Sequence, residues 1–238
     1  MKVQKVVIVI VLLSIASLAK AQYYWYGPEG MGPYFRAGIG PTIFQDSMVK
    51  SFYSPADPSV PYNGVNGPSG RVNYDVGFAF DGAFGWAFNK YVGLDFDTGY
   101  IWGRMNSVQN YQANGSTMAN VPLLADLTIS LPIPHTNIVP YIGGGAGGAV
   151  SILDAHNFTY PPTGDYADGS ESDLVFAYRA FAGVRFMLGP NVSLGVGYQY
   201  FATGNPTFTY TGYLLPDLNT EFQGVRTHSI MFTLHANF

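Results

Sequence analysis

The sequence predicts an all-β fold: an eight-stranded antiparallel up-and-down transmembrane β-barrel that follows a cleavable N-terminal signal peptide. Three observations support this prediction. Segments that alternate large apolar residues with small or polar residues recur along the chain. The connections between these segments are alternately short and long. Within the segments, the charged residues share a face with the small side chains. A soluble barrel shows the reverse arrangement of faces, so the large apolar face is expected to meet lipid.

The first residues have the pattern of a secretory leader. Lys2 and Lys5 precede an apolar run at 6–19, and residues 19–21 read Ala-Lys-Ala, which suits a cleavage site. The run is shorter than the roughly 20 residues that a transmembrane helix needs. We therefore expect a signal peptide at 1–21, an N-terminal periplasmic segment at 22–32 and an outer-membrane β-barrel at 33–238.

Composition agrees with a membrane barrel and narrows the possible partners. Charged residues make up 11% of the chain, against roughly 25% in an ordinary soluble domain, and aromatic residues make up 16%. The chain has no cysteine, which excludes disulfides and thiol chemistry. The formal net charge is −4 and becomes more negative once the lysines of the leader are removed, so nucleic acid is not expected as a partner.

Eight segments are expected to form strands. In chain order they are 34–44, 72–88, 91–104, 120–133, 139–153, 173–188, 192–202 and 225–238. Short turns are expected at 89–90, 134–137 and 189–191, and long loops at 45–71, 105–119, 154–172 and 203–224. This alternation places the turns at one end and the loops at the other, as in barrels with periplasmic turns and extracellular loops. An even number of strands leaves both termini in the periplasm.

The second, third and fourth segments are defined by their alternation. In the second, a row of aromatic residues stands opposite Asp75 and Asp81. In the third, large apolar residues stand opposite Asp95 and Asp97, and in the fourth they stand opposite Asp126. A charge that faces lipid at mid-bilayer costs roughly 2–4 kcal/mol, so these carboxylates are assigned to the lumen.

The fifth to eighth segments follow the same logic. The fifth contains the glycine run 143–148, which lacks the Gly-Lys-Ser/Thr ending of a phosphate loop, so no nucleotide or other cofactor is expected. These glycines are expected to make room in the lumen for Phe181, Phe201 or arginines. The sixth segment carries arginines on its small face, the seventh follows a Gly-Pro-Asn turn, and the eighth alternates up to its final aromatic residue, Phe238.

The lumen is expected to hold a network of charges. Its predicted members are Arg36, Asp75, Asp81, Asp95, Asp97, Asp126, Arg179 and Arg185. The lumen of an eight-stranded barrel is just wide enough for side chains to fill, and buried charges must pair. We expect the three arginines to bridge acids from strands two to four, with at least one aspartate relying on water, a hydroxyl or protonation. The network is interpreted as a polar plug, with a gated polar path as the alternative.

No catalytic or metal site is expected. The four histidines, His135, His156, His228 and His235, show no spacing typical of metal ligands. His228 and Ser229 are neighbours in a strand and therefore face opposite ways, so they cannot form a catalytic pair without a bulge. The acidic loop within 154–172 could hold calcium, but a solvated acidic loop is the preferred interpretation.

Several motifs resemble one family. Residues 33–40 are similar to the opening strand of the small outer-membrane β-barrel family that includes OmpA-like and opacity-type proteins. Residues 140–147 resemble its fifth strand, and 181–186 with 192–200 resemble its sixth and seventh. The terminal Phe238 matches the aromatic signal that the barrel-assembly machinery reads in this family. The resemblance implies a mostly closed barrel in a Gram-negative outer membrane, in contact with outer-membrane lipid and lipopolysaccharide.

The resemblance does not fix one activity, because the fold carries several functions. We expect a structural or surface-interaction role in which four extracellular loops contact a ligand outside the cell. A narrow porin-like channel for small solutes is the alternative, and a lipid-modifying outer-membrane enzyme is the third possibility.

Overall fold

The structure of the protein is a computed structural model that describes residues 31–54, 57–61, 70–108, 115–160, 165–210 and 218–238. The predicted signal peptide at 1–21 lies outside the described residues, as does most of the predicted periplasmic segment at 22–32. Across these described stretches, no helix has the length and apolar character needed to span a membrane.

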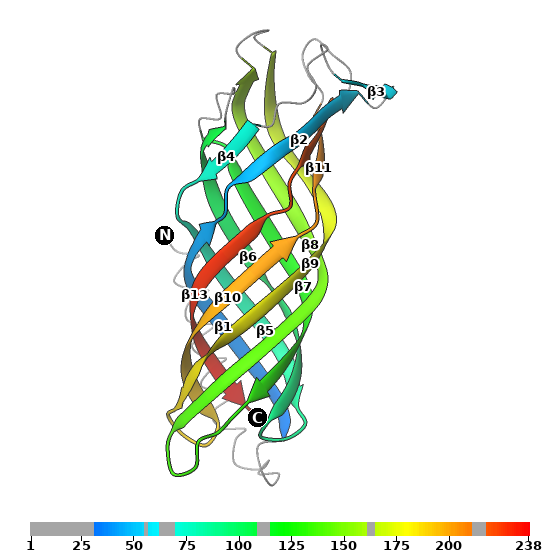
Figure 1. Ribbon diagram of the computed structural model, residues 1–238. Coiled ribbons are helices and arrows are strands. Elements are labelled where there is room, and N and C mark those ends of the chain that lie inside the picture. Colours follow the sequence, from blue (N-terminus) through cyan, green and yellow to red (C-terminus); the bar gives the residue numbers. More distant parts are fainter. Residues whose placement is uncertain (1–30, 55–56, 62–69, 109–114, 161–164, 211–217) are drawn as a thin grey trace, which may run out of the picture.

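Eight antiparallel strands close into a barrel (Figure 1). They are β1 (Gly32–Phe44), β5 (Gly77–Ala87), β6 (Val92–Val108), β7 (Thr117–Ser130), β8 (Ile138–Tyr160), β9 (Asp165–Met187), β10 (Val192–Thr203) and β13 (Arg226–Asn237). Each pairs with the next of these strands along the chain, and β1 pairs with β13 from Tyr34 opposite Asn237 to Phe44 opposite Thr227. The predicted all-β, eight-stranded, up-and-down architecture is confirmed.

The short turns join neighbouring strands as the turn residues predict. Between β5 and β6, the Asn89 side-chain oxygen accepts hydrogen bonds from the backbone nitrogens of Tyr91 and Val92, at 2.7 and 2.9 Å. Between β9 and β10, the backbone nitrogen of Leu188 donates to the carbonyl of Val192 at 2.9 Å. These contacts satisfy backbone groups that the ends of the strands would otherwise leave unpaired.

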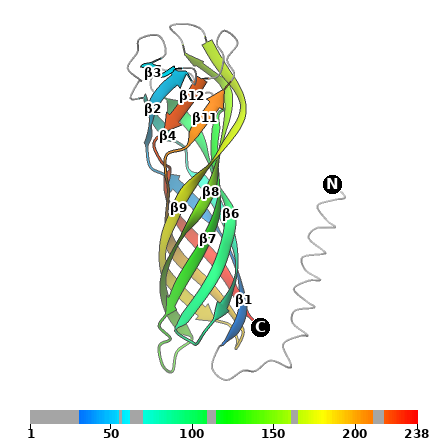
Figure 2. The ribbon, with the colours of Figure 1, turned by 90° about the vertical axis from the view of Figure 1, so that its right-hand side faces the viewer.

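Much of the predicted loop region is folded into strands, which corrects the sequence interpretation. The strands are β2 (Ser47–Ser54), β3 (Asp57–Pro61), β4 (Gly70–Tyr74), β11 (Thr207–Tyr210) and β12 (Leu218–Phe222). Four of them form a sheet in the order β11-β12-β2-β4, in which β4 pairs with β6, and β3 pairs with β2 beside this sheet. Figure 2 shows this sheet beyond the loop-side end of the barrel, next to the outer parts of β8 and β9. We call these five short strands, together with residues 154–160 of β8 and 165–172 of β9, the cap.

The hairpin of β8 and β9 is the longest part of the cap. Its pairing runs from Ile138 opposite Phe186 to Tyr160 opposite Asp165, and each strand has 23 residues. A transmembrane strand needs about 9–11 residues, so more than half of the hairpin extends beyond the bilayer. The predicted loop at 154–172 is therefore largely paired strand, because continued pairing satisfies backbone groups that a loop would leave to water.

The outward face of the barrel is apolar, as the alternation predicts. Large side chains such as Phe35 on β1, Phe84 on β5 and Phe232 on β13 are exposed on the outside. Their neighbours in sequence point inward and are small, polar or charged. This reversal of the soluble arrangement is the expected surface for a barrel surrounded by lipid.

Candidate functional site

Six charged side chains from five strands meet inside the barrel. We call them the charge cluster: Arg36 on β1, Asp81 on β5, Asp95 and Asp97 on β6, Asp126 on β7 and Arg179 on β9. Each belongs to the inward set of its strand, because successive side chains alternate between the two faces. The four carboxylates and Arg179 are buried, with Asp97 and Asp126 fully inaccessible to solvent.

Arg36 makes contact with all four carboxylates. Its Nη2 atom lies 3.1 Å from Asp95 Oδ1, 3.0 Å from Asp97 Oδ2 and 3.4 Å from Asp126 Oδ2. Its Nη1 atom lies 3.7 Å from Asp81 Oδ2. The planar guanidinium thus joins three neighbouring strands to β1 through a single side chain.

Arg179 approaches the same carboxylates from the other side of the lumen. Its Nη2 atom lies 2.7 Å from Asp97 Oδ2 and also donates to Asp126 Oδ2, while its Nη1 atom lies 3.6 Å from Asp81 Oδ2. The Tyr34 hydroxyl donates to Asp95 Oδ2 at 2.5 Å. A buried carboxylate needs such charged or hydrogen-bonding partners, because it has lost its hydration shell.

The cluster holds more acidic than basic groups. Four carboxylates face two guanidinium groups, and neither oxygen of Asp81 accepts a hydrogen bond. One oxygen of Asp97 and one oxygen of Asp126 also accept no hydrogen bond. The sequence-based expectation that acids outnumber arginines in the lumen therefore describes the cluster that the structure contains.

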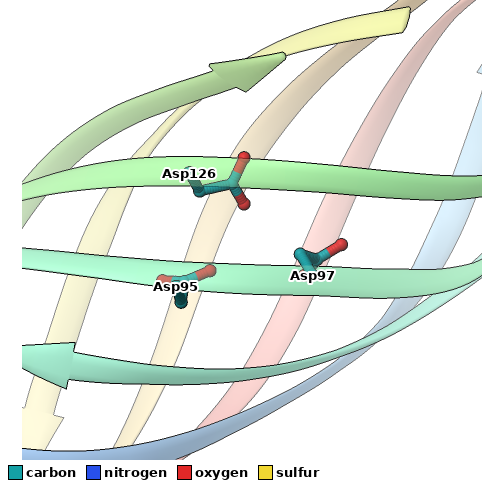
Figure 3. Close-up of side chains that lie close together, drawn as sticks. All are labelled: Asp95, Asp97 and Asp126. Atoms are coloured by element: carbon teal, nitrogen blue, oxygen red, sulfur yellow. The ribbon is translucent and has the colours of Figure 1, made fainter. Parts of the chain in front are cut away.

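Three of the carboxylates have the spacing of a cation site. Single oxygens of Asp95, Asp97 and Asp126 lie within 4.8 Å of one another, and Figure 3 shows these side chains on adjoining strands. The Nη2 atom of Arg36 is within 3.4 Å of all three residues. A guanidinium therefore already occupies the place that a metal ion would take.

Glycines on the neighbouring strands make the cluster possible. A Cβ atom on Gly145 would lie 2.0 Å from Asp126 Oδ1, and one on Gly38 would lie 2.4 Å from Asp81 Oδ1. Gly143 leaves space for the ring of Phe181, which a Cβ atom would approach to 2.4 Å. The glycine run therefore provides room for large lumen groups, as predicted for Phe181, and it also provides room for a carboxylate.

Arg185 lies apart from the charge cluster, which corrects one predicted pairing. Its guanidinium donates to Ser130 Oγ and, at 2.9 Å, to His235 Nδ1, and it stands over the ring of Tyr141. Among the described residues it forms no ion pair with a carboxylate. Alternation predicts which face a side chain occupies but not its height in the lumen. The predicted pairing of Arg185 with the carboxylates is therefore wrong.

Asp75 also differs from its predicted position. It is exposed and lies in the break between β4 and β5. Before the break, the even-numbered residue Val72 points into the interior. After the break, the odd-numbered residues Gly77 and Ala79 point into the interior, so the inward face changes from even to odd residue numbers. An unpaired stretch in a strand changes which residues share a face, so Asp75 does not join the lumen network.

The loop-side half of the interior is filled by apolar side chains, a feature that the sequence interpretation missed. We call this set the apolar layer: Phe44, Val49, Val72, Ile101, Met105, Met118, Leu153, Phe201, Phe208, Phe222 and Val225. All are buried, and the ring of Phe208 meets that of Phe222 edge-on at 5.7 Å. The ring of Phe44 stacks on that of Tyr74 at 5.0 Å, and burial raises the pKa of Tyr74 to about 12.

Neutral polar pairs lie between the charge cluster and the apolar layer, together with the buried apolar side chains of Leu124 and Met231. Thr42 Oγ1 lies 2.7 Å from Ser229 Oγ, and Ser151 Oγ donates to Asn120 Oδ1 at 2.7 Å. On β1 the inward order is Arg36, Thr42 and then Phe44. The lumen thus passes from a charged part, through a mixed part of neutral polar and apolar side chains, to an apolar part towards the cap, and following the alternation to the end of each strand could have revealed this change.

Next to the charge cluster, the described residues enclose a small cavity. A cavity of about 20 Å³ lies between the charge cluster and the His235 end, next to Tyr34, Arg36 and Arg185. This volume suits about one water molecule. The described side chains therefore pack closely at this height of the lumen, and the polar plug stays a prediction for the barrel as a whole.

The geometry of His228 and Ser229 matches the prediction that they cannot act together. Ser229 is buried inside the barrel and bonds to Thr42. His228 faces outward, where its ring nitrogens meet Gln45 and Tyr198. The backbone between them has the regular alternation of β13, so a shared reaction centre has no geometric basis.

Known proteins place these features in a family context. The family described as outer membrane protein beta-barrel domain matches residues 7–238. A curated protein named "Outer membrane protein" from Gluconacetobacter diazotrophicus is 27% identical over 201 residues, which are 76% of this chain and 50% of that protein. The chain therefore spans about half the length of this relative.

Two solved structures share the fold. The outer membrane protein OprG from Pseudomonas aeruginosa has a TM-score of 0.57 at 12% identity, over 88% of this chain and 98% of that one. Neisserial surface protein A has a TM-score of 0.50 at 15% identity, over 88% of this chain and all of that one. The closed barrel, the apolar outer face and the match across nearly the whole sequence agree, and the chain belongs to the outer membrane protein β-barrel family of Gram-negative outer membranes.

Proposed function

We propose that the protein acts at the cell surface through its folded cap and that the barrel is a closed support for the cap. The observation that carries this proposal is the filling of the lumen at two heights, by the charge cluster and by the apolar layer. A solute would have to displace buried ion pairs and then pass an apolar constriction, which also opposes water.

The construction of the cap supports a surface role. β2, β4 and β12 pair in one sheet, and β2 lies between β12 and β4. The backbone nitrogen of Thr207 donates to Asp173 Oδ2 at 2.8 Å, which ties β11 to the β8–β9 hairpin. A binding surface built on paired strands is more rigid than one built on loops, so less order has to be gained on binding a partner.

Conductance across planar bilayers tests the closed lumen. We expect no steady openings from the full chain, because buried side chains fill the barrel. Steady, ion-selective openings that disappear in Arg179→Met or Asp126→Asn variants would overturn the plugged-lumen proposal. A reconstitution control is the heat-modifiable gel migration of the folded barrel.

A cap variant tests the surface role. Shortening the β8–β9 hairpin by removing residues 155–168 and joining the ends with a tight turn should leave the barrel folded. We expect cells that carry this variant to attach less to host or abiotic surfaces than cells with the full chain. Equal attachment at equal surface density would contradict a working role for this hairpin.

A narrow cation path is the second candidate. It is favoured by the excess of carboxylates over guanidinium groups and by the oxygens of Asp81 that accept no hydrogen bond. The same bilayer recordings separate the two functions, because a path through the cluster predicts openings that select for cations.

Assembly is proposed to depend on Phe238. Its backbone nitrogen donates to the carbonyl of Pro33 at 3.0 Å, beside the strand pair that closes the barrel. The aromatic signal that the family resemblance implies stands at this position. We expect Phe238→Ala to lower the yield of heat-modifiable protein in outer membranes, while Phe238→Tyr keeps it.

A further inference from the structure

A group of polar and aromatic residues faces outward at the loop-side edge of the apolar belt. We call it the rim cluster: Gln45, Tyr198, Tyr200, Arg226 and His228. On the outer face of β13, Phe232 and Ile230 are exposed apolar residues, and the next two outward positions are His228 and Arg226. The change from apolar to basic marks the level at which acyl chains give way to headgroups.

The histidine is held between two neighbouring strands. It lies opposite Ile43 on β1 and Tyr200 on β10. Its ring is 5.9 Å from that of Tyr198 and 5.3 Å from that of Tyr200. Packing of this kind orders the polar groups in advance of any ligand.

The hydrogen bonds of His228 assign its tautomer and leave the hydroxyl hydrogen of Tyr198 outside this contact. Gln45 Nε2 lies 2.6 Å from His228 Nε2, and the amide nitrogen donates to it. The ring hydrogen of the neutral imidazole then resides on Nδ1, which donates to the Tyr198 oxygen 2.5 Å away. The hydroxyl hydrogen of Tyr198 is therefore available to an acceptor in the surrounding membrane.

Arg226 supplies the positive charge of the rim cluster. It is exposed, faces the same side as His228, and lies two residues from it, which is roughly 7 Å along a strand. Within the part of the chain that the structure describes, Arg226 forms no ion pair. A guanidinium without an ion-pair partner, on the same outer face as a hydroxyl donor, suits a phosphate group, whose oxygens accept bidentate hydrogen bonds.

We propose that the rim cluster binds a phosphate group of an outer-leaflet lipid. Arg226 contacts the phosphate through its guanidinium, and Tyr198 donates its hydroxyl hydrogen to another phosphate oxygen. His228 and Gln45 hold Tyr198 in place. The neighbouring exposed side chains Ile230 and Ile43 lie against the upper acyl chains of the same lipid. The outward position distinguishes this site from the lumen, which lipids do not reach.

The test uses the full chain in phosphatidylcholine nanodiscs that contain a small fraction of lipid A, and native mass spectrometry counts the lipid A that the protein retains. We expect bisphosphorylated lipid A to be retained and dephosphorylated lipid A to be lost. Arg226→Gln should lower retention about tenfold, and Tyr198→Phe, which removes one hydrogen-bond donor, about threefold.

Arg71→Gln is the matched control, because Arg71 is an exposed arginine on β4 of the cap and is not one of the rim residues. It should retain lipid A like the unaltered protein. Equal losses in the Arg226 and Arg71 variants, or equal retention of dephosphorylated lipid A, would overturn the proposal. Displacement of lipid A by inorganic phosphate at equal concentration would instead assign the site to free anions. Heat-modifiable migration verifies folding, and Tyr198→Phe provides the decisive variant should Arg226→Gln not fold.

Discussion

The charge cluster and the apolar layer fill the same lumen by different physical means. In the cluster, two guanidinium groups hold four carboxylates, and each group depends on its partners. In the apolar layer, side chains such as Phe44, Met118 and Phe201 exclude water without any specific partner. Ion pairs are directional, so the cluster fixes which strands lie together, whereas apolar packing seals the end of the barrel.

Removing one guanidinium should have the largest effect. Arg179→Met leaves Asp97 and Asp126 buried with less compensation, and a broken buried ion pair costs about 3–5 kcal/mol. We expect a loss near the upper end of that range, measured as the urea midpoint for loss of heat-modifiable migration. Arg71→Met, on the exposed cap surface, should leave the midpoint unchanged.

A second substitution sharpens this test. Asp126→Asn in the Arg179→Met background removes one of the uncompensated charges and should recover part of the lost stability. A further drop in the urea midpoint would show that the carboxylate of Asp126 does not depend on Arg179.

Truncating a residue of the apolar layer should lower the free energy of unfolding by less than the loss of Arg179. It also tests which part of the lumen keeps the barrel closed to ions. Phe201 is fully buried, and Phe201→Ala removes packing worth about 3 kcal/mol. The barrel should nevertheless remain closed to ions, because the charge cluster still fills it. Urea unfolding and bilayer recordings of the same sample test both parts, and openings in this variant would mean that the apolar layer alone seals the lumen.

Two glycines allow the packing of the cluster to be tested with the same chemical change. Gly145→Ala places a methyl group 2.0 Å from Asp126 Oδ1 and 2.3 Å from the Ala125 carbonyl oxygen, whereas no atom lies within 4 Å of a Cβ atom on Gly82. Overpacking of this kind costs about 1–3 kcal/mol. We expect Gly145→Ala to lower the urea midpoint and Gly82→Ala to leave it in place. Equal midpoints would show that β8 can move away from the cluster.

The smallest expected effect is the change in the stability of the cap at high pH that Tyr74 causes. Tyr74 has a folded pKa of about 12, above the ordinary value of 10.0, because burial disfavours its ionised form. As the pH rises above 10, the unfolded chain loses this proton first, so the cap loses stability between pH 10 and pH 12. In Tyr74→Phe this decline should be shallower. Protease sensitivity of the cap across this pH range measures it, and identical profiles would exclude a contribution from Tyr74.

The barrel could be predicted because each outward residue has the same environment. Lipid penalises a charge on the outer face, so alternation alone assigned Arg36, Asp97 and Arg179 to the lumen. It could not place Asp75, because the break before β5 changes which residues face inward. Nor could it pair Arg185 with His235, since alternation fixes the face of a residue and not its height.

The cap was less predictable for a related reason. Outside the bilayer, lipid no longer enforces alternation, and segments rich in Gly, Asn and Pro resemble loops even when their backbones pair. β2 and β12 form such a pair, and Phe222 on β12 is buried in the apolar layer. The rim cluster escaped notice because His228 and Gln45 come from opposite ends of the chain and meet only when β1 pairs with β13.

The distribution of the charge cluster along the chain has a consequence for how the barrel is assembled. The carboxylates come from β5, β6 and β7, one arginine comes from β1, and the other comes from β9. A partly inserted sheet that lacks β9 therefore presents four carboxylates with the single guanidinium of Arg36 on the face that will become the lumen. The second guanidinium, that of Arg179, arrives only when β9 joins the sheet, so the cluster has a lower electrostatic cost in the completed barrel than in a sheet that ends before β9.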